Sequence, residues 1–186
     1  HNDLTGATLT DNNGYSLTDG CPAEGCSGYE LMTDLDFDTN GNGEFDSEDR
    51  FYNDGEGWLP VASGSTTYFT AQFNGNGYTL DNLTIARPTI NRQGFISHAQ
   101  NSILQNLALT NVDIDCDYDC GALIGLLEVS TDVSWSNLSA SGKLNSNDHS
   151  GALLVGRVTL EDSGHLQGSD LTAHGTVTGV TYTGGM

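Results

Sequence analysis

The second half of this chain repeats a short pattern at nearly constant intervals, and this repeat limits the possible folds more than any other feature. The first motif occurs as Gly121-Ala122-Leu123-Ile124-Gly125, as Gly151-Ala152-Leu153-Leu154-Val155-Gly156, and as the beginning of a third copy at Gly184-Gly185-Met186. A second motif precedes each copy, at Asn106-Leu107, Asn137-Leu138 and Asp170-Leu171, with Leu-to-Leu spacings of 31 and 33 residues. The two motifs keep step, so they belong to one unit of about thirty residues.

Within each unit, apolar and polar residues alternate in short runs bounded by Gly, Asn, Ser and Asp, which is typical of β-strands and turns. A looser copy starts at Asn82-Leu83-Thr84-Ile85 and runs to Gly94-Phe95-Ile96. A unit of short strands buries its apolar face by stacking on the next unit. We therefore predict an all-β fold, a right-handed parallel β-helix (β-solenoid). The alternative is a β-sandwich, which would not require the sequence to repeat in phase.

The 186 residues are enough for one domain with a substantial core. We expect a single solenoid over 1–186, with N-terminal coils over 1–80 and repeats over 81–186. The start at His1 and the end within a repeat suggest one piece of a longer protein. Four aromatic residues of the first half are expected either to close the first coil as a plug or to pack as ordinary core: Phe37, Trp58, Phe69 and Phe73.

The segment 38–49 matches the spacing of a twelve-residue calcium loop. Gly43 stands at the sharp turn, and Phe45 at the apolar position that anchors such a loop. The predicted oxygen ligands are Asp38, Asn40, Asn42, Glu44 through its carbonyl, Asp46 and Asp49. The last position is usually Glu, and the shorter side chain of Asp49 is less suited to bidentate closure. With no second loop and no flanking helices, we expect a structural Ca²⁺ clamp of weak extracellular type. The alternative is a polar turn that binds nothing.

A second acidic run alternates with apolar residues at Asp113, Asp115, Asp117 and Asp119. On a straight strand these four carboxylates would share one face, where they would either hold a second calcium or be solvated.

The four cysteines form two close pairs, Cys21 with Cys26 and Cys116 with Cys120, which favours an oxidising compartment. Local pairing is the simplest of three connectivities, and zinc is the competing interpretation. A bridge between Cys116 and Cys120 would force a bend at 117–119, because four extended residues span about 13 Å and bridged Cα atoms lie about 5.5 Å apart.

The formal charge is -20, from five Lys and Arg against twenty-five Asp and Glu. Such a charge repels nucleic acid and anionic membranes and suits a secreted protein in salty water, where the Debye length at ~0.5 M salt is roughly 4 Å. No long apolar run predicts a membrane span. No nucleophile motif occurs, and the five cations are dispersed in the sequence, so we expect no enzyme activity: Arg50, Arg87, Arg92, Lys143 and Arg157.

Four features of the sequence carry a resemblance to a known family: Tyr29 to Phe37, Gly57 to Val61, Phe73 to Ile85, and the Gly-Ala-Leu-Ile-Gly repeats. They resemble the GLUG-motif family of bacterial surface and secreted proteins, many of them adhesins. The chain departs from the family pattern by an extra residue in Gly151–Gly156 and by Ile96-Ser97 after Gly94-Phe95. The resemblance implies a β-helix of the filamentous-haemagglutinin type and a secreted or cell-surface location. We expect a calcium-stabilised adhesive or spacer module, with a surface glycan or protein as ligand, or alternatively a carbohydrate-binding or carbohydrate-active domain.

Overall fold

The computed structural model of the chain describes residues 26–64, 66–161 and 163–184. Twelve strands and one short 3-10 helix are formed over these residues. Their bounds are β1 Gly28–Glu30, β2 Leu35–Asp36, η1 Asn53–Gly55, β3 Gln72–Asn74, β4 Thr79–Asp81, β5 Thr84–Arg87, β6 Ile96–Gln100, β7 Leu104–Cys116, β8 Cys120–Gly121, β9 Ile124–Val129, β10 Asp132–Ala152, β11 Val155–Leu160 and β12 His165–Gly184.

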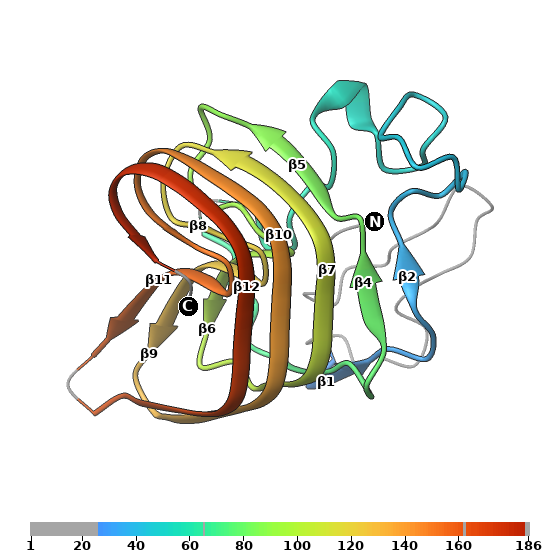
Figure 1. Cartoon of the computed structure of the whole chain (residues 1–186). Helices are drawn as coiled ribbons and strands as arrows, with labels where there is room; N and C mark the ends of the chain where they lie inside the picture. Colours follow the sequence, from blue (N-terminus) through green and yellow to red (C-terminus); the bar gives the residue numbers. More distant parts are fainter. Residues whose placement is uncertain (1–25, 65, 162, 185–186) are drawn as a thin grey trace.

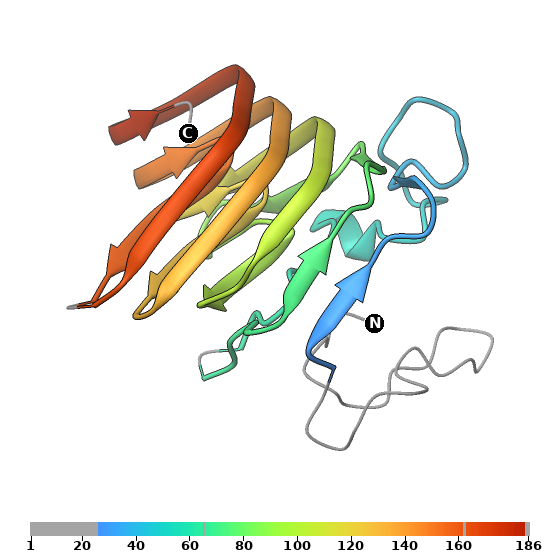
Figure 2. The ribbon, with the colours of Figure 1, turned by 90° about the horizontal axis from the view of Figure 1, so that it is seen from below.

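The strands form two parallel sheets, and the chain winds from one to the other. The larger sheet follows the order β1-β3-β7-β10-β12, with β2, β4, β5 and β8 paired beside this path, and the smaller sheet has the order β11-β9-β6. Figures 1 and 2 show β7, β10 and β12 side by side as successive coils of one stack. The predicted all-β parallel solenoid is therefore confirmed.

The register places equivalent residues of successive repeats directly above one another. Leu138 of β10 pairs with Leu107 of β7 on one side and with Leu171 of β12 on the other. Leu107 and Leu138 are 2 % and 1 % exposed. The 31- and 33-residue spacings of the second motif are thus the lengths of two coils, and the leucines form a continuous ladder in the core.

The residue before each of these leucines turns the chain at a corner of the coil. Asn106, Asn137 and Asp170 have positive φ angles of 56°, 52° and 55°, a conformation that Asn and Asp tolerate better than other non-glycine residues. Asn137 Nδ2 donates to Asn106 Oδ1 at 3.2 Å, and Asn106 Nδ2 donates to Asn74 Oδ1 at 3.1 Å. The corners are therefore linked by an asparagine ladder that runs along the stack.

The register also corrects the phase of the first motif. Gly121 pairs with Ala152, not with Gly151, and Ile124 pairs with Val155. The extra residue of the 151–156 copy is therefore Gly151, which pairs with Cys120 ahead of the repeated segment. The motif needs glycine because the backbones approach closely: a Cβ on Gly121 would lie 2.3 Å from the Ile124 carbonyl oxygen.

The looser copy predicted over 82–96 disagrees with the strand register at its beginning. Leu80 pairs with Leu109, and Thr84 pairs with Asp113, so the segment from Asn82 lies beside the end of β7 and not beside its Asn106 corner. Asn74 occupies the equivalent corner. Hydrogen bonding pairs Thr79 with Ala108 and Thr84 with Asp113, so the matching letters of Asn82-Leu83 and Asn106-Leu107 do not lie side by side. At the other end, Gln93 pairs with Cys120, which places Gly94 level with Gly121 as the repeat predicts, but Ile96 pairs with Ile124 and not with Leu123.

The first coil is longer than the others because it carries an insertion. Its strands are short: only β1 and β2 form in the segment 29–37 that alternates in sequence. The proposed plug residues are all buried in the single core cluster, with exposed fractions of 8 % or less. Trp58 packs edge-on against Phe37 and stacks on Phe95. The aromatic side chains are thus core residues of the first two coils.

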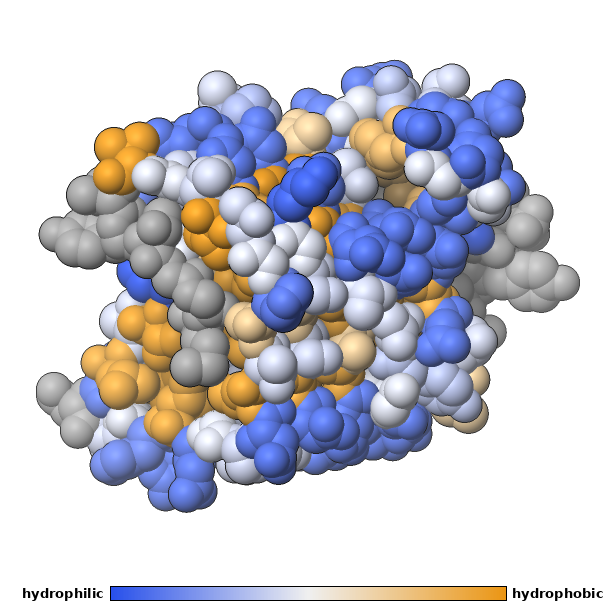
Figure 3. Space-filling model, in the orientation of Figure 1, coloured by the Kyte–Doolittle hydropathy of each residue, from blue (hydrophilic) through white to orange (hydrophobic). Residues whose placement is uncertain are grey.

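Apolar side chains become exposed toward the last described coil. Val158 and Leu160 of β11 are 38 % and 57 % exposed, and Val180 of β12 is 75 % exposed. Figure 3 shows apolar side chains reaching the surface at this end of the stack.

Candidate metal centre

The predicted calcium loop is the insertion of the first coil, and it begins directly after the buried Phe37. Asp38 organises its first half. One carboxylate oxygen accepts hydrogen bonds from the N–H groups of Gly41 and Asn42, at 2.8 and 3.2 Å, and the other accepts from Gly43 at 2.8 Å. Gly43 has a φ of 83°, which explains the glycine at the sharp turn. In Figure 2 the loop stands at the N-terminal end of the stack.

Asp49 closes the loop from the other side and is only 5 % exposed. Its Oδ1 accepts from the Thr39 N–H at 2.7 Å, and its Oδ2 accepts from the Asp46 N–H at 3.1 Å. Burial acts to raise the pKa of this carboxyl, but the N–H groups of Asp46, Thr39 and Asn40 outweigh burial and hold the pKa below its ordinary value. Asp49 is therefore kept ionised inside the loop.

The middle residues converge on Asp46. Asn40 and Asn42 donate from their amide nitrogens to the Asp46 carboxylate at 3.3 and 2.8 Å. The Asn42 oxygen accepts from the Glu44 N–H at 2.7 Å. Phe45 is half-buried and packs on Tyr52, with ring centroids 5.0 Å apart. The structure thus brings the predicted residues together in one compact loop anchored by Phe45.

The loop also faces the body of the solenoid across a cavity of about 210 Å³. Its lining includes acidic residues from both sides: Asp38, Glu44 and Asp49 of the loop, and Asp113 of β7. Sequence reasoning did not connect Asp113 with the loop, because 64 residues of chain separate it from Asp49 and the register of β5 on β7 sets its place. Four like-charged groups around one cavity repel one another unless a cation neutralises them.

The donor set is of the type that calcium prefers, since carboxylate, amide and carbonyl oxygens bind this hard cation. The geometry fits in part. The ligand residues are gathered, but in the described part of the chain no three His, Cys, Asp or Glu side chains are close enough together to form a metal-binding group by themselves. Two of the predicted side-chain ligands, Asn40 and Asn42, are amides, and both turn their nitrogens toward Asp46. Calcium binding would require these amides to present oxygen instead.

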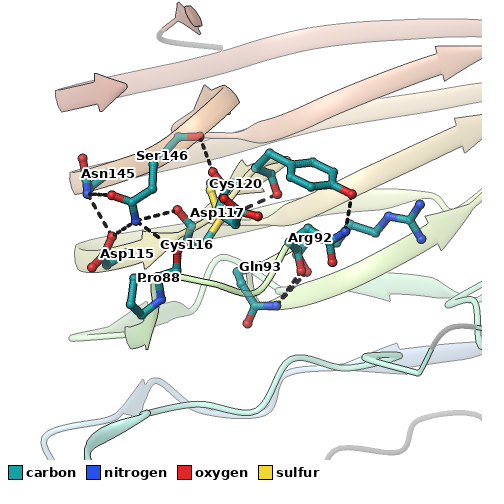
Figure 4. Close-up of a disulfide and its surroundings, with 12 residues drawn as sticks. Pro88, Arg92, Gln93, Asp115, Cys116, Asp117, Cys120, Asn145 and Ser146 are labelled. Carbon is teal, nitrogen blue, oxygen red and sulfur yellow. Dashed lines mark hydrogen bonds between the residues drawn. A yellow bond between two sulfur atoms is a disulfide. The ribbon is translucent and has the colours of Figure 1, made fainter. Parts of the chain in front are cut away.

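The Cys116–Cys120 disulfide is formed, as predicted, with the two Cα atoms 6.1 Å apart. β7 ends at Cys116 and β8 begins at Cys120, so the chain bends at 117–119. Figure 4 shows the disulfide at this bend, next to Ser146 of β10, whose hydroxyl donates to the Asp117 carbonyl at 3.2 Å. Cys21 lies outside the described residues, and so does the pairing predicted for Cys21 and Cys26.

The bend separates Asp117 and Asp119 from Asp113 and Asp115, which lie on the outward side of β7. Asp113 faces the loop 38–49, Asp115 accepts from the amides of Asn145 and Asn147, at 2.9 and 2.8 Å, and Asp119 is fully buried beside Arg157. The four side chains therefore do not share one strand face, because the disulfide prevents the straight strand on which that face depended.

Comparison with known proteins gives one sequence similarity. The chain is similar to Halomucin of Haloquadratum walsbyi. The two are 32 % identical over 134 residues, which is 72 % of this chain but 1 % of the Halomucin sequence. The chain thus spans about 1 % of the length of this relative. No protein-family model matches the chain, and no solved structure matches it.

Among the described residues, no helix has the length and hydrophobicity needed to cross a bilayer. The similarity to Halomucin and the β-solenoid fold are together compatible with an exported surface module.

Proposed function

We propose that this chain is a calcium-stabilised adhesive or spacer module of a large exported surface protein. The observation that carries the calcium part is the loop 38–49. All of its predicted ligand residues lie in one folded unit, and three of them face Asp113 of the solenoid across a shared cavity. A cation there would offset the repulsion between loop and solenoid and fix the loop against the stack.

Three observations support the exported location. The relative carries the name of a mucin and is far longer than this chain. The disulfide Cys116–Cys120 is of a kind that persists in oxidising compartments. The charge of -20 keeps a protein soluble in strong salt. Stacked parallel coils form a scaffold that suits spacing or adhesion. We propose no catalytic role. We also propose, from the sequence resemblance alone, that the chain is related to the GLUG-motif proteins.

Calcium binding is tested by adding Ca²⁺ to chelator-treated protein and measuring the melting temperature. For a site with a Kd on the order of 1 mM, 10 mM Ca²⁺ is expected to stabilise the fold by about 1.4 kcal/mol. Asp49→Asn is expected to remove this response. Glu48→Gln, which removes the same charge from a loop residue outside the predicted ligand set, is expected to retain it. No shift of the wild-type melting temperature at 10 mM Ca²⁺ would show that the loop is a polar turn.

Surface exposure is tested separately by labelling intact cells of the source organism with an antibody against this chain. Labelling before permeabilisation is expected. Labelling that requires permeabilisation would exclude the exported location without bearing on calcium.

A further inference from the structure

A second cavity, of about 380 Å³, lies where the loop after Trp58 meets the segment between β5 and β6. Its lining contains the cationic side chains Arg87 and Arg92 together with His98, and no Asp or Glu is among its described lining residues. The chain has only five Lys and Arg against twenty-five Asp and Glu. Two of the five cations thus lie five residues apart at one cavity whose described lining residues include no Asp or Glu.

The cations at this cavity are held with unused hydrogen-bonding capacity. The Arg87 side chain is 11 % exposed; its Nη1 contacts Glu56 at 2.8 Å, but its buried Nε and Nη2 have no hydrogen-bond partner. The Nε of Arg92 is also buried without one, and Arg92 forms no ion pair with any described residue. Figure 4 shows the Arg92 guanidinium extending away from the disulfide with no dashed line to it. Buried donors of this kind are normally satisfied, so their number here points to a ligand.

His98 adds a third nitrogen group. It is 3 % exposed, neither ring nitrogen has a hydrogen bond, and the nearest carboxylate oxygen, of Glu128, lies 3.4 Å from Nε2. Burial, followed in smaller measure by Arg92 and Arg157, lowers the pKa of His98, although Glu128 acts in the opposite direction. A neutral His98 can donate from one ring nitrogen without adding to the local positive charge.

The remaining lining residues are uncharged and indicate which groups the ligand carries besides an anionic one. Asn91, Gln93 and Ser97 bring amide and hydroxyl groups, and the Gln93 Oε1 is buried without a partner. Pro60 and Ile90 add apolar surface. An oxyanion alone would use the guanidinium groups, whereas an amide oxygen without a partner requires a donor such as a hydroxyl. The volume lies in the range of small-molecule sites, about 300 to 1,000 Å³.

We propose that this cavity binds a single unit of an acidic sugar, with its carboxylate or sulfate group at Arg87 and Arg92 and its hydroxyl groups at Gln93 and Ser97. Guanidinium groups bind both oxyanions through paired N–H donors. The proposal is independent of the calcium loop, because the cavity beside that loop and this cavity share no lining residue.

The test is calorimetric titration of the whole chain with glucuronate and glucose 6-sulfate. Glucose, acetate and inorganic sulfate serve as probes for the sugar body and the free ions. At least one acidic sugar is expected to bind at least about tenfold more tightly than glucose and than its matching free ion, because a charge-assisted hydrogen bond accounts for a factor of this size. Equal binding of the free ion would reduce the cavity to an ion site, and equal binding of glucose would remove the role of the arginines. Either result, or no binding of either acidic sugar, overturns the proposal.

Variants locate the site. Arg92→Gln is expected to weaken acidic-sugar binding at least about tenfold, while Lys143→Gln, which removes one positive charge from an exposed position on β10, is expected to leave binding unchanged. If Arg92→Gln does not fold, the exposed lining residue Ser63 offers a second pair. Ser63→Glu places a carboxylate at the cavity and is expected to abolish binding, while Ser63→Gln is expected to retain it. Equal affinities within either pair would place the ligand elsewhere.

Discussion

The carboxylate of Asp119 is completely buried at the bend between β7 and β8, and one of its oxygens lies 3.0 Å from the guanidinium of Arg157, one coil further along the stack. The Arg157 side chain is 40 % exposed. Burial raises the pKa of Asp119, and the positive charges of Arg157, Arg92 and His149 partly offset that effect. Arg157 therefore offsets part of the cost of burying this carboxylate, whose two oxygens have no hydrogen-bond partner.

We expect Arg157→Gln to destabilise the fold by roughly 2 to 4 kcal/mol, because it leaves a buried carboxylate without its partner. A raised folded-state pKa gives stability that is present below the ordinary value of 3.8 and is lost as the pH rises through the folded-state pKa. The loss of Arg157 raises this pKa further, so the deficit of the variant is expected to grow between pH 4 and pH 7. Urea unfolding across this range measures it. Asp119→Asn in the variant background is expected to recover part of the stability; a deficit that does not change with pH would contradict the role of the ion pair.

The loop is expected to respond to acid in the opposite direction. The lowered pKa of Asp49 means that its stabilisation is present above the ordinary value of 3.8 and is lost as the pH falls through the lower folded-state pKa. Amide exchange of residues 38–49 should therefore accelerate below about pH 4, relative to its intrinsic pH dependence, before exchange in β7 and β10 does. Asp49→Asn cannot accept from the Asp46 N–H at its amide nitrogen and is expected to cost about 1 to 3 kcal/mol at neutral pH. Uniform loss of protection along the whole chain would show that the loop is not a separate unit.

Removing the disulfide is expected to have a moderate and local effect. Cys116 and Cys120 are only four positions apart in the sequence, so the disulfide closes a short loop. The chain-entropy contribution of so short a loop is about 2 kcal/mol. We expect the Cys116→Ala, Cys120→Ala double variant to lose about this much stability in denaturant unfolding, with the largest increase in hydrogen exchange at 117–119. A loss above about 5 kcal/mol would indicate that the bridge also determines the register of β7 on β10.

The glycine of the repeat motif can be tested by adding a single methyl group. Gly121→Ala places a Cβ 2.3 Å from the Ile124 carbonyl oxygen and 2.4 Å from the Gly156 nitrogen, so two backbone segments must move apart. We expect a loss of at least about 2 kcal/mol, in the range of overpacked cores. Gly28→Ala is the control, because its nearest contact would be an ordinary 3.7 Å from Gln72. Similar melting temperatures for the two variants would contradict the close approach of backbones at this corner.

Much of the core could be predicted because its apolar residues recur in the sequence at intervals of one coil. The leucine spacings equal the coil lengths, since Leu107, Leu138 and Leu171 stack directly. The bend at 117–119 also followed from the sequence, because covalent geometry limits how far apart bridged cysteines can be. The phase of the first motif could not be fixed in this way: Gly121 and Gly151 match as letters, whereas hydrogen bonding pairs Gly121 with Ala152.

Some functional residues could likewise be predicted from local sequence, and others could not. The sequence by itself determined the loop 38–49, because Asx and glycine turns are local and their partners lie within twelve residues, as the hydrogen bonds of Asp38 and Asp49 show. Only the tertiary structure decided which distant groups meet. The winding of the coils placed Asp113 opposite the loop, Arg157 beside Asp119, and the segment 59–64 beside Arg87 and Arg92 at one cavity. The physical reason is that a solenoid makes neighbours of residues about thirty positions apart, and the exact offset depends on turns and insertions that local sequence patterns do not encode.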